Sequence, residues 1–221
     1  MVLTLADFDG KHAGEDVWVV GSDASVDHFP AGFWEGRIVV AINEMAQHIP
    51  ATYCVTKADH SGAWVQKQAA NHADVLHVVS KHPNGDPSRG LSNVTGPNVV
   101  TFDHDRNFCD SFDASRHIPT GPNKLLVSWS TLGSGMHFAA RLGPRTVFMV
   151  GVSGGSFDGA TNLNGYYETV GGGPIEGMSR QTQPIADRLA ELYGTTFVNV
   201  LPWANLRCGG STFRSDYGKL N

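Results

Sequence analysis

Cysteine is scarce and widely spaced in this chain of 221 residues. The three cysteines form no CxxC pair, which argues against both a zinc knuckle and a disulfide framework. An odd number of scattered thiols is typical of a reducing compartment, so we expect a cytoplasmic protein. The three are Cys54, Cys109 and Cys208.

Long apolar stretches and runs of positive charge are also absent. No stretch approaches the roughly 20 apolar residues of a membrane span. Residues 1–10 carry acidic side chains and no long apolar core, so we expect no signal peptide. Lys and Arg are dispersed and the formal net charge is −5. Because nucleic-acid backbones are bound through basic faces, the composition gives no support to a nucleic-acid-binding protein.

Several catalytic signatures are missing as well. The ten histidines form no HxH or HExxH pair, and the first apolar run is not followed by GxGxxG. Residues 151–155, Gly-Val-Ser-Gly-Gly, come close to the GxSxG form of a nucleophile elbow. The pattern fixes no His and Asp partners for this serine, so a hydrolase triad is disfavoured.

Short β-branched runs without polar alternation recur along the chain, as in parallel strands that are covered on both faces. Helical patterns lie between them, and this alternation predicts a three-layer, Rossmann-like α/β domain with a mostly parallel sheet. In the last helix we expect Ile185, Leu189 and Leu192 to share one apolar stripe. The expected strands are 16–21, 37–42, 52–56, 75–79, 98–102, 146–150 and 196–200, and the expected helices are 63–72, 131–142 and 181–193.

The length and the lack of a linker predict one domain over residues 1–221. Residues 80–97 and 151–179 exceed ordinary connection lengths, so we interpret them as functional loops or lid elements. The second of these combines glycines, carboxylates and a pair of tyrosines, which suits a mobile cover over a polar ligand.

Polar residues follow the first two expected strands. Residues 21–25, Gly-Ser-Asp-Ala-Ser, form a small turn in which backbone N–H groups can approach a phosphate or ribose. Asn43 ends the second strand and can bind a ligand or cap the following helix. Ligands of open α/β sheets bind outside the carboxyl ends of the strands. We therefore expect ligand contacts at Gly21, Ser22, Asp23, Ser25 and Asn43, with a plain structural turn as the alternative.

Ionisable groups follow two further strands. Lys57, Asp59 and His60 come after the third strand and could position phosphate, bind a metal or transfer a proton, or lie in a solvated loop. Asp103 and Asp105 come after the fifth and resemble the DxD element with which many glycosyltransferases hold a divalent ion. Carboxylate oxygens suit Mg or Mn, so these two residues are candidate metal ligands.

A small-residue segment precedes the sixth expected strand. Ser130 or Thr131 can cap the helix that begins there, and the free N–H groups at its start can face an anion. Ser134 and Gly135 are small enough for close approach of a ligand or of neighbouring backbone. Both are candidate ligand contacts.

In this order, the elements resemble the opening and the later αβ units of two related groups. These are the bacterial lipooligosaccharide sialyltransferases and the MptE-like 6-hydroxymethylpterin diphosphokinases. The resemblance implies a Rossmann-variant sheet that binds a nucleotide donor through 21–25 and Asn43, with Ser134 and Gly135 nearby. The segments that carry the resemblance are 21–25, Phe29-Pro30, Asn43, 132–143, 145–151 and 181–199.

The sequence departs from those groups at three points. Asp23-Ala24 stands where they have Gly-Pro, and Gly151-Val-Ser153 lacks the carboxylate of their Gly-x-Asp. Residues 176–180 contain no histidine, whereas the sialyltransferases carry a catalytic one shortly before the last helix. A different general base is therefore required, and the candidates are Asp59, His60 and Glu176.

The leading hypothesis is a glycosyltransferase that uses a nucleotide-sugar donor and a hydroxyl acceptor on a glycan, protein or modified nucleic acid. Asp59 or His60 would act as the base, while Lys57, Arg180 and a metal on Asp103 and Asp105 would stabilise the departing phosphate. The alternatives are an ATP-dependent diphosphotransferase of the MptE-like type and a non-catalytic nucleotide-binding module.

Overall fold

The structure is a computed structural model that describes residues 3–57, 62–81, 94–104, 114–128, 130–152 and 175–200, with the backbone alone at 104, 114 and 175–180. One eight-stranded sheet runs through it, and every strand pair is parallel. The strands are β1 (Asp16–Val20), β2 (Ile38–Ile42), β3 (Tyr53–Thr56), β4 (Leu76–Ser80), β5 (Val99–His104), β6 (Lys124–Leu125), β7 (Thr146–Val150) and β8 (Thr196–Asn199).

The strand order is β6-β5-β4-β3-β2-β1-β7-β8. The chain therefore adds strands outward from β1 on one side, then returns and adds β7 and β8 on the other side of β1. Because all strands are parallel, their carboxyl ends lie at one edge of the sheet. The order reverses between β1 and β7, where open α/β sheets often form a ligand crevice, but here backbone hydrogen bonds join the two strand ends.

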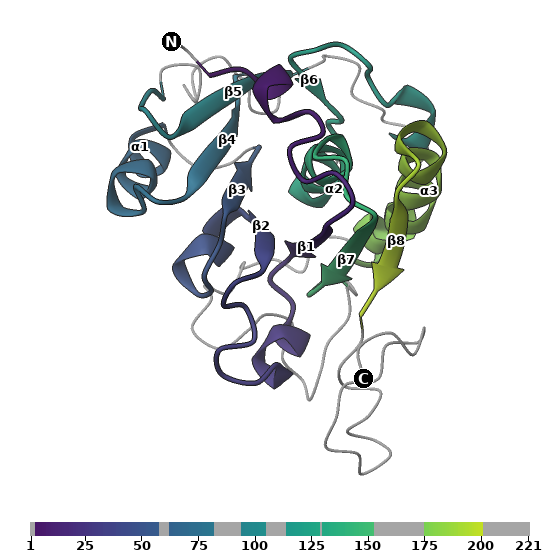
Figure 1. Cartoon of the computed structure of the whole chain (residues 1–221), viewed down its shortest axis with the longest axis horizontal. Helices are drawn as coiled ribbons and strands as arrows, with labels where there is room; N and C mark the ends of the chain where they lie inside the picture. The colour runs from purple at the N-terminus through teal and green to yellow at the C-terminus, as the bar shows by residue number, and fades with distance from the viewer. Residues whose placement is uncertain are drawn as a thin grey trace.

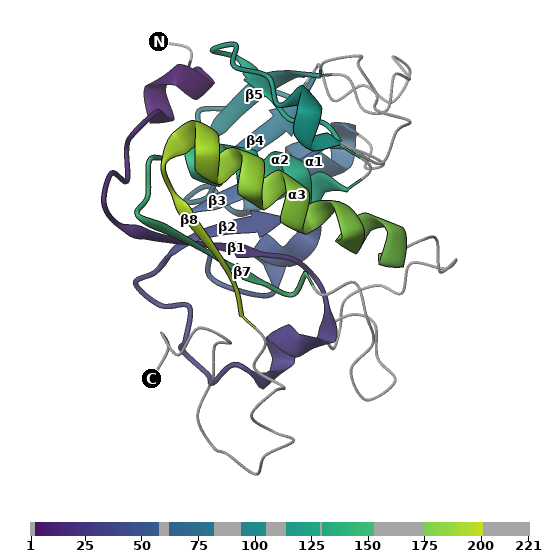
Figure 2. The ribbon, with the colours of Figure 1, turned by 90° about the vertical axis from the view of Figure 1, so that its right-hand side faces the viewer.

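The sheet is the middle of three layers (Figure 1). The helices α2 (Thr131–Arg141) and α3 (Ile175–Tyr193) lie side by side on one face, which is also where the 3-10 turn η1 (Leu5–Phe8) packs (Figure 2). The other face carries α1 (Gly62–Asn71) and the 3-10 turns η2 (Ala24–His28) and η3 (Asn43–Gln47). A further 3-10 turn, η7, spans Ala114–His117.

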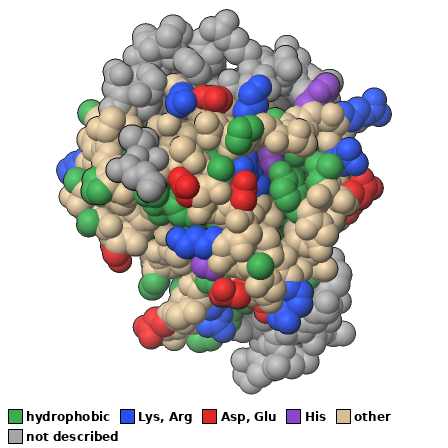
Figure 3. Space-filling model, turned by 45° about the horizontal axis from the view of Figure 1, so that its top comes forward, with side chains coloured by type: hydrophobic (Ala, Val, Ile, Leu, Met, Phe, Trp, Pro, Cys, Tyr) green, Lys and Arg blue, Asp and Glu red, His purple; other side chains and the backbone are tan. Residues whose placement is uncertain are grey.

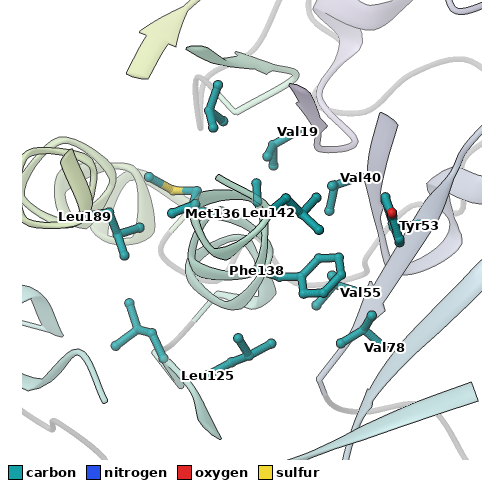
Figure 4. Packing of buried hydrophobic residues seen from close by; sticks show 14 of the residues in the cluster. Val19, Val40, Tyr53, Val55, Val78, Leu125, Met136, Phe138, Leu142 and Leu189 are labelled. Carbon is teal, nitrogen blue, oxygen red and sulfur yellow. The ribbon is translucent and has the colours of Figure 1, made fainter. Parts of the chain in front are cut away.

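The larger core lies between the sheet and α2 (Figure 4). Phe138 on α2 and Leu142 directly after it extend toward strand side chains that include Val40 and Val55, while Met136 lies on the side of α2 that faces Leu189 of α3. Burying a side chain of the size of Phe138 stabilises the fold by about 2–3 kcal/mol. The helix starts where Ser130 accepts a hydrogen bond from the Leu132 N–H, which confirms Ser130 as its cap.

Seven of the eight strands and all three α-helices were predictable from the sequence, with four corrections. The strand β6 was missed. Asp103 lies inside β5, because its pairing with Lys124 extends that strand. Residues 175–179, expected in a loop, begin α3. Leu192 is 38% exposed, since Tyr193 takes the place facing the core and bonds to His137.

Two expected features lie mostly outside the described part of the chain. Residues 82–93 and 153–174, the greater part of the two expected lids, are not described. Among the helices that the structure describes, none is both long and apolar enough to span a membrane.

Candidate ligand-binding edge of the sheet

The carboxyl edge gathers candidate ligand-binding residues from four adjacent strands. Gly21 follows β1, Asn43 follows β2, Lys57 follows β3 and Lys81 follows β4. Neighbouring strands lie about 5 Å apart, so this row extends over roughly 15 Å. Ile42, the last residue of β2, pairs with Val55, and Thr56, the last residue of β3, pairs with Val79, so β3 and β4 each end one residue beyond the strand before. Three of these four positions, Gly21, Asn43 and Lys57, were expected from the sequence.

The β1 end of the row is closed by backbone contact. The Gly21 N–H donates to the Val150 carbonyl at 2.8 Å, and the Asp23 N–H donates to the Gly151 carbonyl at 3.2 Å. A Cβ at position 21 would lie 2.4 Å from the Gly151 oxygen. Gly151 has a φ of +68°, which turns the chain away after β7. Only glycine fits at position 21, because it lets the ends of β1 and β7 meet.

Replacing Gly21 by alanine should therefore destabilise the protein. The added methyl must push apart two backbones rather than a flexible side chain, and overpacking of this kind costs about 1–3 kcal/mol. Chemical denaturation measures this loss. Gly96→Ala is the matched control, since its nearest neighbours are side-chain atoms of Val99 and Asn98 at 3.2 and 3.3 Å, which can move. Equal stabilities of the two variants would contradict this account of the β1–β7 junction.

The turn after Gly21 is stabilised internally. The Asp23 carboxylate accepts from the Ser25 N–H at 2.7 Å and so begins η2. Both residues are buried, and the Ser25 hydroxyl oxygen bonds to none of the residues that the structure describes. These internal contacts are the ones expected of a turn with a purely structural role. Ligand contact by Gly21, Ser22, Asp23 and Ser25 stays a prediction.

Asn43 has an unusual backbone. Its φ of +53° is the one left-handed value among the described non-glycine residues, and Asn tolerates that region better than most residues. The conformation turns the chain from β2 directly into η3. The Asn43 carbonyl accepts from the Cys54 thiol at 3.1 Å, whereas its side-chain Oδ1 is buried without a partner among the described residues.

Lys57 is the most buried cation of the described chain, with 2% of the residue exposed. Its ammonium group donates to the Ser128 carbonyl, two residues before the cap of α2. A cation is thus fixed at the carboxyl end of β3, beside the start of α2. The helix start supplies free N–H groups and the positive end of its dipole, so positive potential from two sources meets here.

Ser134 and Gly135 lie one turn further into α2 and are buried. The Ser134 hydroxyl donates to the Leu126 carbonyl at 2.6 Å. A Cβ at Gly135 would lie 2.3 Å from Cδ1 of Ile42, the last residue of β2. Gly135 lets α2 approach the Ile42 side chain at the end of β2, next to Asn43, while Ser134 contacts neighbouring backbone, one of the two expected alternatives. Their contact with a ligand stays a prediction.

The candidate metal and catalytic residues are only partly described. Asp103 accepts from the ammonium of Lys81 at 2.8 Å, an ion pair that the sequence analysis missed although Lys81 directly follows a strand. Asp59, His60 and Asp105 lie outside the described residues, and Arg180 lies on α3 with its side chain undescribed. In the described ranges, no group of three or more His, Cys, Asp or Glu residues could hold a metal.

Charge on the described surface is mixed. On the face in Figure 3, Lys and Arg side chains lie interspersed with Asp and Glu. This agrees with the dispersed basic residues of the sequence and offers that face no basic stripe for a nucleic-acid backbone.

The chain is similar to a solved glycosyltransferase. This is the MAf glycosyltransferase from Magnetospirillum magneticum AMB-1, at 14% identity and a TM-score of 0.49. The alignment covers 88% of the chain but only 35% of the longer protein, so the chain spans about a third of its length. No protein-family model matches the sequence, and no curated protein is significantly similar to it. A likeness this distant transfers neither an activity nor a substrate.

Proposed function

We propose that this protein transfers a sugar from a nucleotide-sugar donor bound at the carboxyl edge of the sheet between β1 and β4. The observation that carries the proposal is the buried Lys57, which is held at the Ser128 carbonyl beside the start of α2. When a glycosyl donor reacts, negative charge accumulates on the departing nucleoside phosphate. A fixed cation and a helix N-terminus stabilise such charge in place, with little reorganisation.

The neighbouring groups fit the same chemistry. Lys81 adds a second cation one strand further along the edge, and it is paired with Asp103. Asp103 is the first carboxylate of the DxD triplet. A divalent ion bound there would replace Lys81 as the partner of this carboxylate. Asp59 and His60 follow Lys57 directly in the sequence, so the proposal assigns the activation of the acceptor hydroxyl to them.

A thermal-shift screen tests the proposal and identifies the donor class. The panel contains CMP, UDP, GDP, ADP and their sugar conjugates, each with and without Mg or Mn. A ligand that binds only the folded state adds about 2.7 kcal/mol of stability at 100 times its Kd. A donor that passes this screen is then incubated with hydroxyl acceptors, and sugar transfer with release of the nucleotide is measured. If no nucleotide raises the melting temperature, the proposal fails.

Lys57→Met should weaken binding of the donor found in that screen. Loss of a charged hydrogen bond to phosphate costs about 1.5–3 kcal/mol, which corresponds to roughly a 10- to 150-fold higher Kd. Isothermal titration on folded protein measures the change. Lys67→Met, at an exposed position of α1, is the matched control and should bind like the parent protein. Equal Kd values for the two variants would remove Lys57 from the site.

A further inference from the structure

A small cavity lies behind Asn43, on the face of the sheet covered by α1. Its volume is about 10 Å³, and residues from η3, β3, α1 and β4 line it. That volume is about what a single water molecule requires and is far too small for a base, a sugar or a phosphate. The polar lining residues that matter are Asn43, Cys54, Thr56 and His77.

Two buried polar atoms of the lining residues bond to nothing in the described part of the chain. They are Oδ1 of Asn43 and Nε2 of His77, and His77 is only 1% exposed. A buried acceptor without a partner is destabilising, so two of them on residues that line one cavity require an explanation.

Both atoms are hydrogen-bond acceptors. Burial lowers the pKa of His77 to about 4, so the ring is neutral near pH 7. The ring also bonds to the backbone of His72, a contact that raises the pKa and is therefore one in which the ring donates. Since Nε2 has no partner, the donor is Nδ1, and Nε2 presents its lone pair.

The other polar side chains around the cavity, which include those of Gln47, Trp64, Gln68 and His72, donate to neither of these two atoms. The Cys54 thiol is directed at the Asn43 carbonyl, and burial raises its pKa to about 12, so it stays protonated. Thr56 lies 3.8 Å from the Cys54 sulfur, and its hydroxyl can rotate. A metal ion does not fit either, because the described residues contain no group of three or more His, Cys, Asp or Glu ligands.

We propose that one ordered water molecule occupies this cavity and donates its two hydrogens to Asn43 Oδ1 and His77 Nε2. Two acceptors require two donors, and a water supplies both in the space available. The water connects η3 to β4 across β3. It also holds the Asn43 amide with its oxygen inward, so that the amide nitrogen faces the strand edge. His77 is then a positioning residue for Asn43. This role rests on the proposed function, but the water site itself does not depend on that function.

A crystal structure of the full chain at about 1.8 Å resolution tests the site directly. The expected result is one density peak at about 2.7–3.2 Å from both acceptors. The peak should disappear or move in His77→Phe, which keeps a ring of similar size, and in Asn43→Gly, which suits the positive φ. A peak that is absent from the parent protein, or that is unmoved in both variants, overturns the proposal.

A double-mutant cycle on the unfolding equilibrium tests the coupling. If one water joins the two acceptors, the double variant His77→Phe/Asn43→Gly should raise the unfolding constant no more than the larger single change does. The control pairs His77→Phe with Arg188→Met, an exposed site on α3, and these two effects should multiply. Multiplying effects for the first pair would overturn the bridge.

If His77→Phe does not fold, ¹⁵N NMR of the parent protein decides, because protonated Nε2 near pH 7 excludes the proposed acceptor. Failure of the nucleotide screen would leave all these results unchanged.

Discussion

Arg141→Met should lower the free energy of unfolding by about 1.5–3 kcal/mol, the usual cost of losing hydrogen bonds to a charged group, since the partner carboxylate of Asp9 is half-exposed. Arg141 ends α2, and its side chain is 6% exposed. Two of its N–H groups bind the Asp9 carboxylate at 2.7 and 2.9 Å. The other three donate to the backbone carbonyls of Gly121 and Pro122, which lead into β6, and of Lys124, which begins it.

All five guanidinium donors are thus used, and they join three segments that are distant in sequence. Methionine fills similar space but leaves the carbonyls and the Asp9 carboxylate without their donor. Urea unfolding of the two proteins measures the difference. Arg145→Met is the matched control, because Arg145 also binds an aspartate, Asp16, but its side chain is 70% exposed. Exposed pairs contribute about 0–1 kcal/mol, so a similar loss in both variants would contradict the assigned role of Arg141.

The sequence predicted what depends on local pattern. Apolar β-branched runs located seven strands, and the expected helices 131–142 and 181–193 stop directly before two glycines with left-handed φ values, Gly143 at +75° and Gly194 at +68°. The strand β6 was missed because two residues, Lys124 and Leu125, carry no periodicity. It exists because it pairs with the end of β5.

The tertiary contacts of polar side chains were not predictable. Lys57 and Ser128 are 71 positions apart, and Arg141 and Asp9 are 132 apart. Strand ends can be listed from a sequence, and this located Asn43 and Lys57 as candidates. Which of these groups become buried depends on the helices that cover them. The burial of Ser134 against Leu126 and the pairing of Lys81 with Asp103 therefore required the structure.

Lowering the pH from 7 to 5 should destabilise the protein through two buried histidines. Burial lowers the pKa of His137 to about 3 and that of His77 to about 4, against about 6.5 in an unfolded chain. Between pH 6.5 and the folded pKa, the unfolded chain binds more protons than the folded protein. Stability is therefore complete above pH 6.5 and is lost as the pH falls.

His137 shows why protonation is unfavourable. Its Nδ1 accepts from the Leu126 N–H at 2.8 Å, so the ring proton is on Nε2, which donates to the Tyr193 hydroxyl at 2.7 Å. A proton on Nδ1 would face the N–H of Leu126, and the positive charge of Arg141 one turn away lowers the pKa further. The same bonds connect α2 to α3 and to the segment after β6, so protonation would loosen all three.

The expected loss is about 2 kcal/mol for each histidine at pH 5, which lies about 1.5 units below the unfolded pKa. Urea unfolding at pH 7 and pH 5 measures it. Glutamine is not protonated in this range, so His137→Gln and His77→Gln should each remove about half of the pH dependence. This holds even if the substitution itself lowers the free energy of unfolding at pH 7. His48→Gln, at an exposed position, should keep the full dependence. A pH dependence that survives both buried substitutions would show that other groups cause it, since neither histidine could then supply the uptake of protons on unfolding.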